Sequence, residues 1–328
     1  MQVQNSSLLS VKNLSLDLMT EAGRYPLIRK ISFDVKEGQV LGIVGESGSG
    51  KTVTCLSLTR LLPEPPILYR EGQVVFDGVD LWRLSEKELR SVRTAGISII
   101  FQDALNALNP VIKVGKQVSE VLQAQQDISR TEAYRQTVAL FQQVGIPLPE
   151  VRYHHFPHQL SGGLQQRVMI AMAIAGNPRL LIADEPTTAL DVTIQVQIIE
   201  LLKDLGRKKG MSIIFINHDL GLIAEMCDEV LVMYGGEIVE YAPVNRLFEN
   251  PVHPYTRLLM ESIPRLDISR GKLKQIPGQP PAPEQYPTGC KFHPRCPFAD
   301  EKCQRESPPK FSIAPNHYHR CWHPSIPE

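Results

Sequence analysis

The 328-residue chain is long enough to bury the core of one large α/β domain and to carry a smaller appendage. Its 35 Lys and Arg residues balance its 35 Asp and Glu residues, which excludes an overall field that attracts nucleic acid or a membrane surface. No apolar run approaches the roughly 18 residues that span a bilayer, and residues 1–5 lack the start of a signal peptide. We therefore expect a soluble, intracellular protein that reaches a membrane only through partners.

Two segments of alternating polarity open the chain. Residues 11–18 and 31–35 alternate apolar and polar side chains, which predicts half-exposed antiparallel strands. Tyr25 lies just before the second segment, where its ring could stack on a purine. An ordinary loop or strand tyrosine fits the sequence equally well.

A glycine-rich loop follows the apolar run at residues 40–44 and leads into a predicted helix. The spacing is G-x-x-x-x-G-K-[ST], that of a phosphate-binding loop, and its residues are Gly45, Glu46, Ser47, Gly48, Ser49, Gly50, Lys51 and Thr52. Backbone N–H groups of such a loop turn toward phosphate oxygens, and the helix dipole adds attraction. Lys51 would reach the β- and γ-phosphates of a nucleotide, and the Thr52 hydroxyl would bind Mg²⁺. The alternative, a glycine-rich turn that binds nothing, is disfavoured by the strand and helix on either side.

Further strands are predicted at residues 72–78 and 97–101, and Gln102 stands at the carboxyl end of the second. Ligands of open α/β sheets lie beyond the carboxyl ends of strands, so Gln102 is placed to meet Mg²⁺ or an attacking water. A solvated loop glutamine is the plain alternative. Residues 118–144 then become helical, with capping-box spacing at residues 129–132, which predicts a helical insertion.

A second glycine-bearing helix start comes at Ser161, Gly162 and Gly163, before the apolar helix at residues 168–175. Exposed N–H groups at such a start suit phosphate. A plain serine N-cap followed by a glycine turn would have the same sequence. The chain thus carries two candidate phosphate-binding helix starts.

Two carboxylates, Asp184 and Glu185, end the apolar strand predicted at residues 180–185. Asp184 is placed to hold Mg²⁺, and Glu185 to orient an attacking water and accept its proton. Paired acids at a strand end can simply be solvated, but such a strand after a phosphate-binding loop favours the functional interpretation. The next strand, at residues 213–216, leads to His218 at the same predicted sheet edge, where the imidazole could touch the γ-phosphate.

The composition changes toward the C-terminus. Twelve of the 26 prolines lie from Pro277 onward, which marks a boundary near residues 265–285. Four cysteines follow with the pattern C-x5-C-x6-C-x17-C: Cys290, Cys296, Cys303 and Cys321. Four thiols in an intracellular chain indicate metal rather than disulfides. Widely spaced thiolates can wrap an iron–sulfur cluster. The alternatives are packing alone, or zinc, although the C-x2-C pairs of structural zinc are missing, with possible help from His293, His317, His319 or His323.

In chain order, these motifs resemble those of the nucleotide-binding subunit of an ATP-binding cassette transporter. Residues 45–52 match the Walker A loop, Gln102 the Q-loop, residues 160–163 the signature, residues 180–185 Walker B with its catalytic glutamate, residues 189–191 the D-loop, and His218 the switch histidine. The resemblance implies an α/β P-loop domain at residues 1–262, with a RecA-like core, an antiparallel β subdomain and a helical subdomain at about 103–160. It also implies a small Cys/Pro-rich extension at residues 263–328.

The resemblance further implies a site shared by two chains. In this family two cassettes pair head to tail, and ATP lies between the Walker A loop of one and the signature of the other. Ser161, Gly162 and Gly163 would then complete the partner's site. Lys51 and Thr52 would bind phosphate and Mg²⁺, Asp184 and Gln102 would support the metal, Glu185 would activate water, and Gln102 and His218 would sense the γ-phosphate.

Residues 101–103, 108–110 and 253–255, together with the C-terminal cysteines, resemble the ATPases of dipeptide and oligopeptide importers, whose relatives also import nickel. This resemblance implies an ATP-hydrolysing subunit on the cytoplasmic face of the cell membrane. Its partners would be two transmembrane permease subunits, an extracytoplasmic solute-binding protein and a second cassette ATPase, generally a paralogue. Some relatives carry a [4Fe–4S] centre in this tail.

Two departures from the family pattern leave the solute open. Leu164 follows the signature where many cassettes have Gln, and residues 104–107 read Ala-Leu-Asn-Ala where peptide importers commonly have Pro-Met-Ser-Ser. A nickel or other small-solute importer is therefore an alternative. A cassette ATPase acting on nucleic acid or ribosomes is disfavoured by the balanced charge and the single cassette. A regulatory subunit with a dead site is disfavoured by the presence of Lys51, Asp184, Glu185 and His218.

Overall fold

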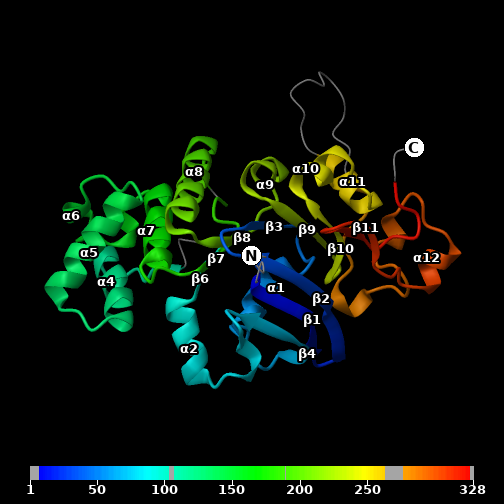
Figure 1. Ribbon diagram of the computed structural model, residues 1–328, viewed down its shortest axis with the longest axis horizontal. Helices are drawn as coiled ribbons and strands as arrows, with labels where there is room; N and C mark the ends of the chain where they lie inside the picture. The colour runs from blue at the N-terminus through cyan, green and yellow to red at the C-terminus, as the bar shows by residue number, and fades with distance from the viewer. Residues whose placement is uncertain (1–6, 103–106, 189, 263–275, 326–328) are drawn as a thin grey trace, which may run out of the picture. The chain divides into compact units, whose positions relative to one another are not determined.

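The computed structural model describes residues 7–102, 107–188, 190–262 and 276–325 (Figure 1). The chain forms two compact units. The first contains residues 1–35, 40–83 and 217–328, and the second contains residues 36–39 and 84–216. No helix within the described ranges is both long enough and apolar enough to cross a bilayer.

The first unit contains an antiparallel sheet in which β1 lies between β2 and β4. The strands of this sheet are β1 (Ser7–Thr20), β2 (Gly23–Lys36), β4 (Ile67–Phe76) and β5 (Val79–Asp80). Leu9 lies opposite Phe76, and both side chains are buried. The strands predicted at residues 11–18 and 31–35 are confirmed, because both fall within β1 and β2.

A second group of strands in this unit begins with a parallel pair, β3 beside β9, and continues in the order β9, β10, β12, β11. Their bounds are β3 (Val40–Val44), β9 (Glu229–Tyr234), β10 (Glu237–Pro243), β11 (Phe311–Ala314) and β12 (His317–His319). In the antiparallel pair of β10 and β12, Glu240 lies opposite His319. The cysteine-rich C-terminal segment therefore adds two strands to a sheet, which sequence analysis did not predict.

Short helices complete the first unit. Their bounds are α1 (Lys51–Leu58), η1 (Leu81–Arg83), α9 (Leu220–Met226), α10 (Val244–Glu249), α11 (Pro254–Glu261), η3 (Pro283–Gln285), η4 (His293–Arg295) and α12 (Glu301–Arg305). Phe292, just before η4, is 1% exposed and packs against Tyr234 and Tyr255, with ring centroids 5.1 and 5.2 Å apart. This aromatic cluster joins the C-terminal segment to β9 and α11.

The second unit is built on three parallel strands in the order β8, β7, β6: β6 (Ile97–Ile100), β7 (Leu180–Asp184) and β8 (Ser212–Ile216). All side chains of β7 and β8 are buried, which explains their unbroken apolar sequences. The strand predicted at residues 97–101 ends one residue early, and Phe101 is exposed.

The helices of the second unit, in chain order, are α2 (Glu86–Ala95), α4 (Val114–Gln125), α5 (Arg130–Gln143), α6 (Pro149–Arg152), η2 (Pro157–Gln159), α7 (Gly162–Ile174) and α8 (Val192–Lys209). The predicted helix start at Ser129 is confirmed, because its side chain accepts a hydrogen bond from the Glu132 N–H. Gly210, at φ 62°, ends α8 in the left-handed conformation that favours glycine.

Some predictions fall outside the described residues. They concern Asp103, most of the 104–107 segment, Ala189 of the D-loop, and the boundary placed at residues 262/263. The domain division at residues 1–262 and 263–328 stays a prediction.

Candidate functional site

The glycine-rich loop connects β3 to α1 and depends on glycine at two places. Gly45 has φ 151°, and a Cβ there would overlap the carbonyl oxygen of Met233 on β9. Gly50 has φ 100°, and a Cβ there would lie 2.7 Å from Ile28 Cδ1. At these two positions the loop backbone therefore passes so close to its neighbours that only glycine fits.

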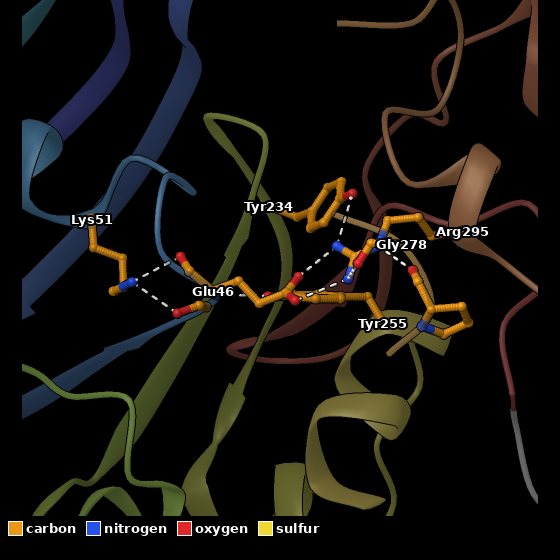
Figure 2. A network of polar contacts seen from close by, with 8 residues as sticks. Glu46, Lys51, Tyr234, Tyr255, Gly278 and Arg295 are labelled. Carbon is orange, nitrogen blue, oxygen red and sulfur yellow. Dashed lines mark hydrogen bonds and ion pairs between the residues drawn. The ribbon is translucent and has the colours of Figure 1, made fainter. Parts of the chain in front are cut away.

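Lys51 is the first residue of α1, and its side chain turns back over the loop (Figure 2). It is 7% exposed, and its Nζ donates to Gly45 O at 2.8 Å and Glu46 O at 3.0 Å. Ser49 Oγ is also buried and has no hydrogen-bond acceptor or donor among the described residues. Thr52, in the first turn of α1, is half-buried. An ammonium group, hydroxyls and a helix N-terminus thus gather at one loop, an arrangement suited to phosphate.

The contacts that hold Glu46 were not predicted from the sequence. Arg295 Nη1 lies 2.6 Å from Glu46 Oε2, and Tyr255 Oη accepts a hydrogen bond from the Glu46 N–H at 2.8 Å. The partners lie 249 and 209 residues away along the chain. No local pattern could have indicated them.

The carboxyl ends of β6 and β7 bring Gln102 and Glu185 together, as their positions at one sheet edge predicted. Gln102 Nε2 donates to Glu185 Oε2 at 2.9 Å, and Thr188 Oγ1 donates to the same oxygen at 3.0 Å. The contact of Thr188 with Glu185 was not predicted. A hydroxyl three residues after the glutamate was the one sequence feature that could have indicated this contact. A half-buried carboxylate oriented by two donors is well placed to hold a water molecule and accept its proton.

Asp184 and Glu185 are adjacent but differ in environment. Asp184 ends β7 and is 4% exposed. Glu185 has φ 44°, in the left-handed region, and its N–H donates to Ile216 O at 2.9 Å. This uncommon backbone conformation ends the strand between the two acids. A buried carboxylate at such a strand end suits a Mg²⁺ ion.

The second glycine-bearing helix start lies at α7. Ser161 occupies the N-cap position, but its hydroxyl makes no capping hydrogen bond. Gly163 contacts the next helix so closely that a Cβ there would lie 2.9 Å from Ile194 Cγ2. Ser161, Gly162 and Gly163 line an open hollow of about 480 Å³ with Arg167 and Asp191. The Ser161 hydroxyl therefore does not act as a simple serine cap of α7.

Two further predicted residues have ordinary surroundings. Tyr25 is half-buried on β2, and its hydroxyl donates to Ala22 O at 3.3 Å. His218 is exposed between β8 and α9. It belongs to the first unit, whereas Gln102 and Glu185 belong to the second. The predicted roles of Tyr25 and His218 stay predictions.

The four C-terminal cysteines are free thiols that lie in one region of the first unit. Cys290 N donates to Cys303 O at 2.8 Å. Burial, together with a smaller contribution from neighbouring thiols, raises the pKa of Cys290 to about 11 and that of Cys321 to about 12. In the case of Cys321, all three other cysteines contribute to this rise. Cys321 is thus close enough to the other three cysteines for them to influence it electrostatically.

The spacing of these thiols bears on the choice of metal. Tetrahedral zinc holds its thiolates about 3.8 Å apart, as follows from Zn–S bonds of about 2.3 Å. In the described part of the chain, the one group of three or more candidate ligand atoms within 4.8 Å of one another is Asp300, Cys303 and His323. The four thiols do not form such a compact group among the described residues.

The chain matches known proteins along most of its length. The profile of the ABC transporter family matches residues 28–188, and that of the oligopeptide/dipeptide transporter C-terminal region matches residues 239–303. The chain is 48% identical to the oligopeptide transport ATP-binding protein OppD of Bacillus subtilis, over 99% of this chain and 92% of that protein. It belongs to the ATP-binding cassette transporter family. The cassette is also 44% identical to the dipeptide transport ATP-binding protein DppD of Escherichia coli, over 97% of each chain.

Solved cassette structures share the fold. The dimeric cassette MJ0796, in a post-hydrolysis state bound to ADP and Pi, superposes with a TM-score of 0.65 at 28% identity. The match covers 72% of this chain and 98% of that one. The predicted α/β P-loop fold and the ATPase class are thereby confirmed.

Proposed function

We propose that this cassette hydrolyses ATP to energise the import of dipeptides or oligopeptides through membrane-embedded permease subunits. The observation that carries the proposal is the similarity to OppD and DppD along nearly the whole chain, including the C-terminal region. A match to the ATPase core alone would support only the class of enzyme.

In the proposed site, the residues of the glycine-rich loop with Lys51 and Thr52 bind the phosphates and Mg²⁺. Asp184 supports the metal, and Gln102 takes part through the carbonyl oxygen that its hydrogen bond to Glu185 leaves available. Glu185 activates water, and Gln102 with His218 senses the γ-phosphate. Tyr25 stacks on adenine. The support comes from the burial of Lys51 over the loop and from the two donors on Glu185.

A second cassette completes the proposed site. Ser161, Gly162 and Gly163 of one chain close over the nucleotide of the other, and the uncapped Ser161 hydroxyl supports this role. The dimeric state of MJ0796 with ADP and Pi is the structural parallel. We further propose that the partner cassette is a paralogue. Two permease subunits and an extracytoplasmic solute-binding protein complete the transporter. This cassette works at the cytoplasmic face of the membrane and binds no nucleic acid.

The transport proposal predicts peptide uptake by a reconstituted complex. The chain, co-purified with its membrane subunits and placed in vesicles with the solute-binding protein, should accumulate a labelled di- or oligopeptide when ATP is supplied. Vesicles lacking the binding protein are the control and should accumulate little. Uptake of nickel without uptake of peptide would contradict the peptide assignment while leaving the ATPase intact.

We propose that Cys290, Cys296, Cys303 and Cys321 hold a [4Fe–4S] cluster, with a structural or regulatory role because ATP hydrolysis needs no electron transfer. Two observations support it: the four cysteines are free thiols in one region of the first unit, and the other three all raise the pKa of Cys321. Because burial raises the pKa of Cys290 and Cys321, these ligands are protonated at neutral pH and must lose protons when metal binds.

Anaerobically purified protein should therefore contain about four iron and four sulfide per chain. Cys321→Ser should lower both contents sharply. Cys55→Ala, which changes a buried cysteine on α1 outside the C-terminal segment, should leave them unchanged. Zinc without iron or labile sulfide would rule out the cluster.

A further inference from the structure

Arg295, in the cysteine-rich C-terminal segment, binds the second residue of the glycine-rich loop (Figure 2). Its Nη1 lies 2.6 Å from Glu46 Oε2 and its Nη2 lies 2.9 Å from Glu46 Oε1. The two parallel contacts form the fork arrangement that makes an arginine–carboxylate pair both strong and directional. The Arg295 side chain is 5% exposed, so solvent screens the pair poorly.

The remaining hydrogen-bonding capacity of Arg295 is also used. Nε donates to Pro277 O at 2.7 Å, Nη2 to Gly278 O at 3.3 Å, and Nη1 to Tyr234 Oη at 3.3 Å. With the two bonds to Glu46, these contacts employ all five N–H donors of the guanidinium group. The guanidinium group is therefore held from several directions, and it in turn holds both oxygens of the Glu46 carboxylate.

Glu46 transmits this constraint to the phosphate-binding loop. Its carboxylate is held by Arg295, its N–H donates to Tyr255 Oη at 2.8 Å, and its carbonyl oxygen accepts from Lys51 Nζ at 3.0 Å. Each polar group of Glu46 thus has a partner. Since Lys51 and the loop amides are the proposed phosphate ligands, the orientation of the Glu46 peptide groups bears directly on nucleotide binding.

The turn that carries Arg295 is anchored on both sides. It is the 3-10 turn η4, in which His293 N donates to Cys290 O at 3.0 Å and Cys296 N donates to His293 O at 3.3 Å. Phe292, immediately before the turn, is buried against Tyr234 and Tyr255. Arg295 therefore lies between two of the four cysteines in the sequence. It also lies next to the aromatic cluster that contacts the loop.

We infer that Arg295 is a positioning residue of the nucleotide site, which sets the backbone of the phosphate-binding loop through Glu46 and thereby couples the cysteine-rich segment to nucleotide binding. The inference rests on the proposed function, because it assumes that residues 45–52 bind nucleotide. It goes beyond that function, since it places a determinant of ATP affinity in the C-terminal segment. A pair that merely fastens this segment to the cassette would affect stability without affecting affinity.

The test is calorimetric titration of the purified full chain with Mg–ADP, which avoids hydrolysis. Arg295→Met keeps the length of the side chain but removes the fork, and should raise Kd about tenfold, the effect of losing one charge-assisted hydrogen-bond pair. Arg295→Lys keeps the charge without the bidentate geometry and should give a smaller rise, about threefold. Arg305→Met, which removes an exposed arginine from the same segment, is the matched control and should leave Kd unchanged.

A double-mutant cycle separates positioning from fastening. If Arg295 acts through Glu46, then Arg295→Met should weaken Mg–ADP binding no further in a Glu46→Gln background. Additive effects of the two substitutions would overturn the inference. So would an Arg295→Met protein that folds and binds Mg–ADP as tightly as the parent chain. If Arg295→Met does not fold, parental affinity in Arg295→Lys overturns it equally. Failure of the parent chain itself to bind Mg–ADP would instead refute the proposed nucleotide site, so the two failures are distinguishable.

Discussion

Glu185→Gln is expected to lower the rate of ATP hydrolysis about 10²- to 10⁴-fold, the usual contribution of a positioned general base. The amide keeps the size of the side chain and can still contact Gln102 and Thr188, but it cannot accept a proton from water. Binding of Mg–ATP should stay close to that of the parent chain. Steady-state ATPase assays paired with equilibrium binding of Mg–ATP measure the two effects separately.

The matched control for this substitution is Glu200→Gln, which makes the same change at an exposed position of α8. Its hydrolysis rate should equal that of the parent. A Glu185→Gln protein that hydrolysed ATP as fast as the parent would refute the catalytic assignment. Equal loss of binding and hydrolysis would show that Glu185 supports the nucleotide rather than the chemical step.

Lys51→Met is expected to weaken Mg–ATP binding about 100-fold or more, because it removes the cation proposed to contact the β- and γ-phosphates. The change also removes the donor to Gly45 O and Glu46 O and so frees the loop that those contacts hold. Calorimetric or dialysis measurements of the Kd for Mg–ATP would test it. Thermal unfolding recorded alongside shows whether the protein remains folded at the temperature of the binding assay.

Lys208→Met is the control for the lysine substitution. Lys208 is exposed on α8, where it pairs with Asp204 at 3.3 Å, and a surface pair of this kind contributes little to stability. Its removal should leave the affinity for Mg–ATP as it is in the parent chain. Unchanged affinity in Lys51→Met would remove the main support for phosphate binding at this loop.

Local patterns in the sequence were sufficient for many elements. Ser129 begins α5 and Gly210 ends α8 because caps act on backbone groups within three or four residues. Gln102 and Glu185 could be predicted as neighbours because each follows an apolar strand, and parallel strands bring their carboxyl ends to one edge. In both cases the decisive interactions follow from short-range geometry or from a general rule of sheet topology.

Other features had no such local signal. Phe101 was expected to end a buried strand but is exposed, because β6 pairs with β7 only through Ile100. The pairing of β12 with β10 joins Glu240 to His319, 79 residues later, and neither strand carries a sequence feature that specifies the other. The mutual proximity of the four cysteines likewise depends on how the C-terminal segment folds back on itself.

The phosphate-binding loop shows both contributions. The sequence alone predicted phosphate binding at this loop, since glycine spacing, a lysine and a helix start specify the conformation and charge of residues 45–52 locally. The residues that hold the loop from outside became visible only in the folded chain. Arg295 and Tyr255 reach Glu46 across more than 200 residues of sequence, through side-chain contacts that exist only once β9, α11 and the cysteine-rich segment have packed together.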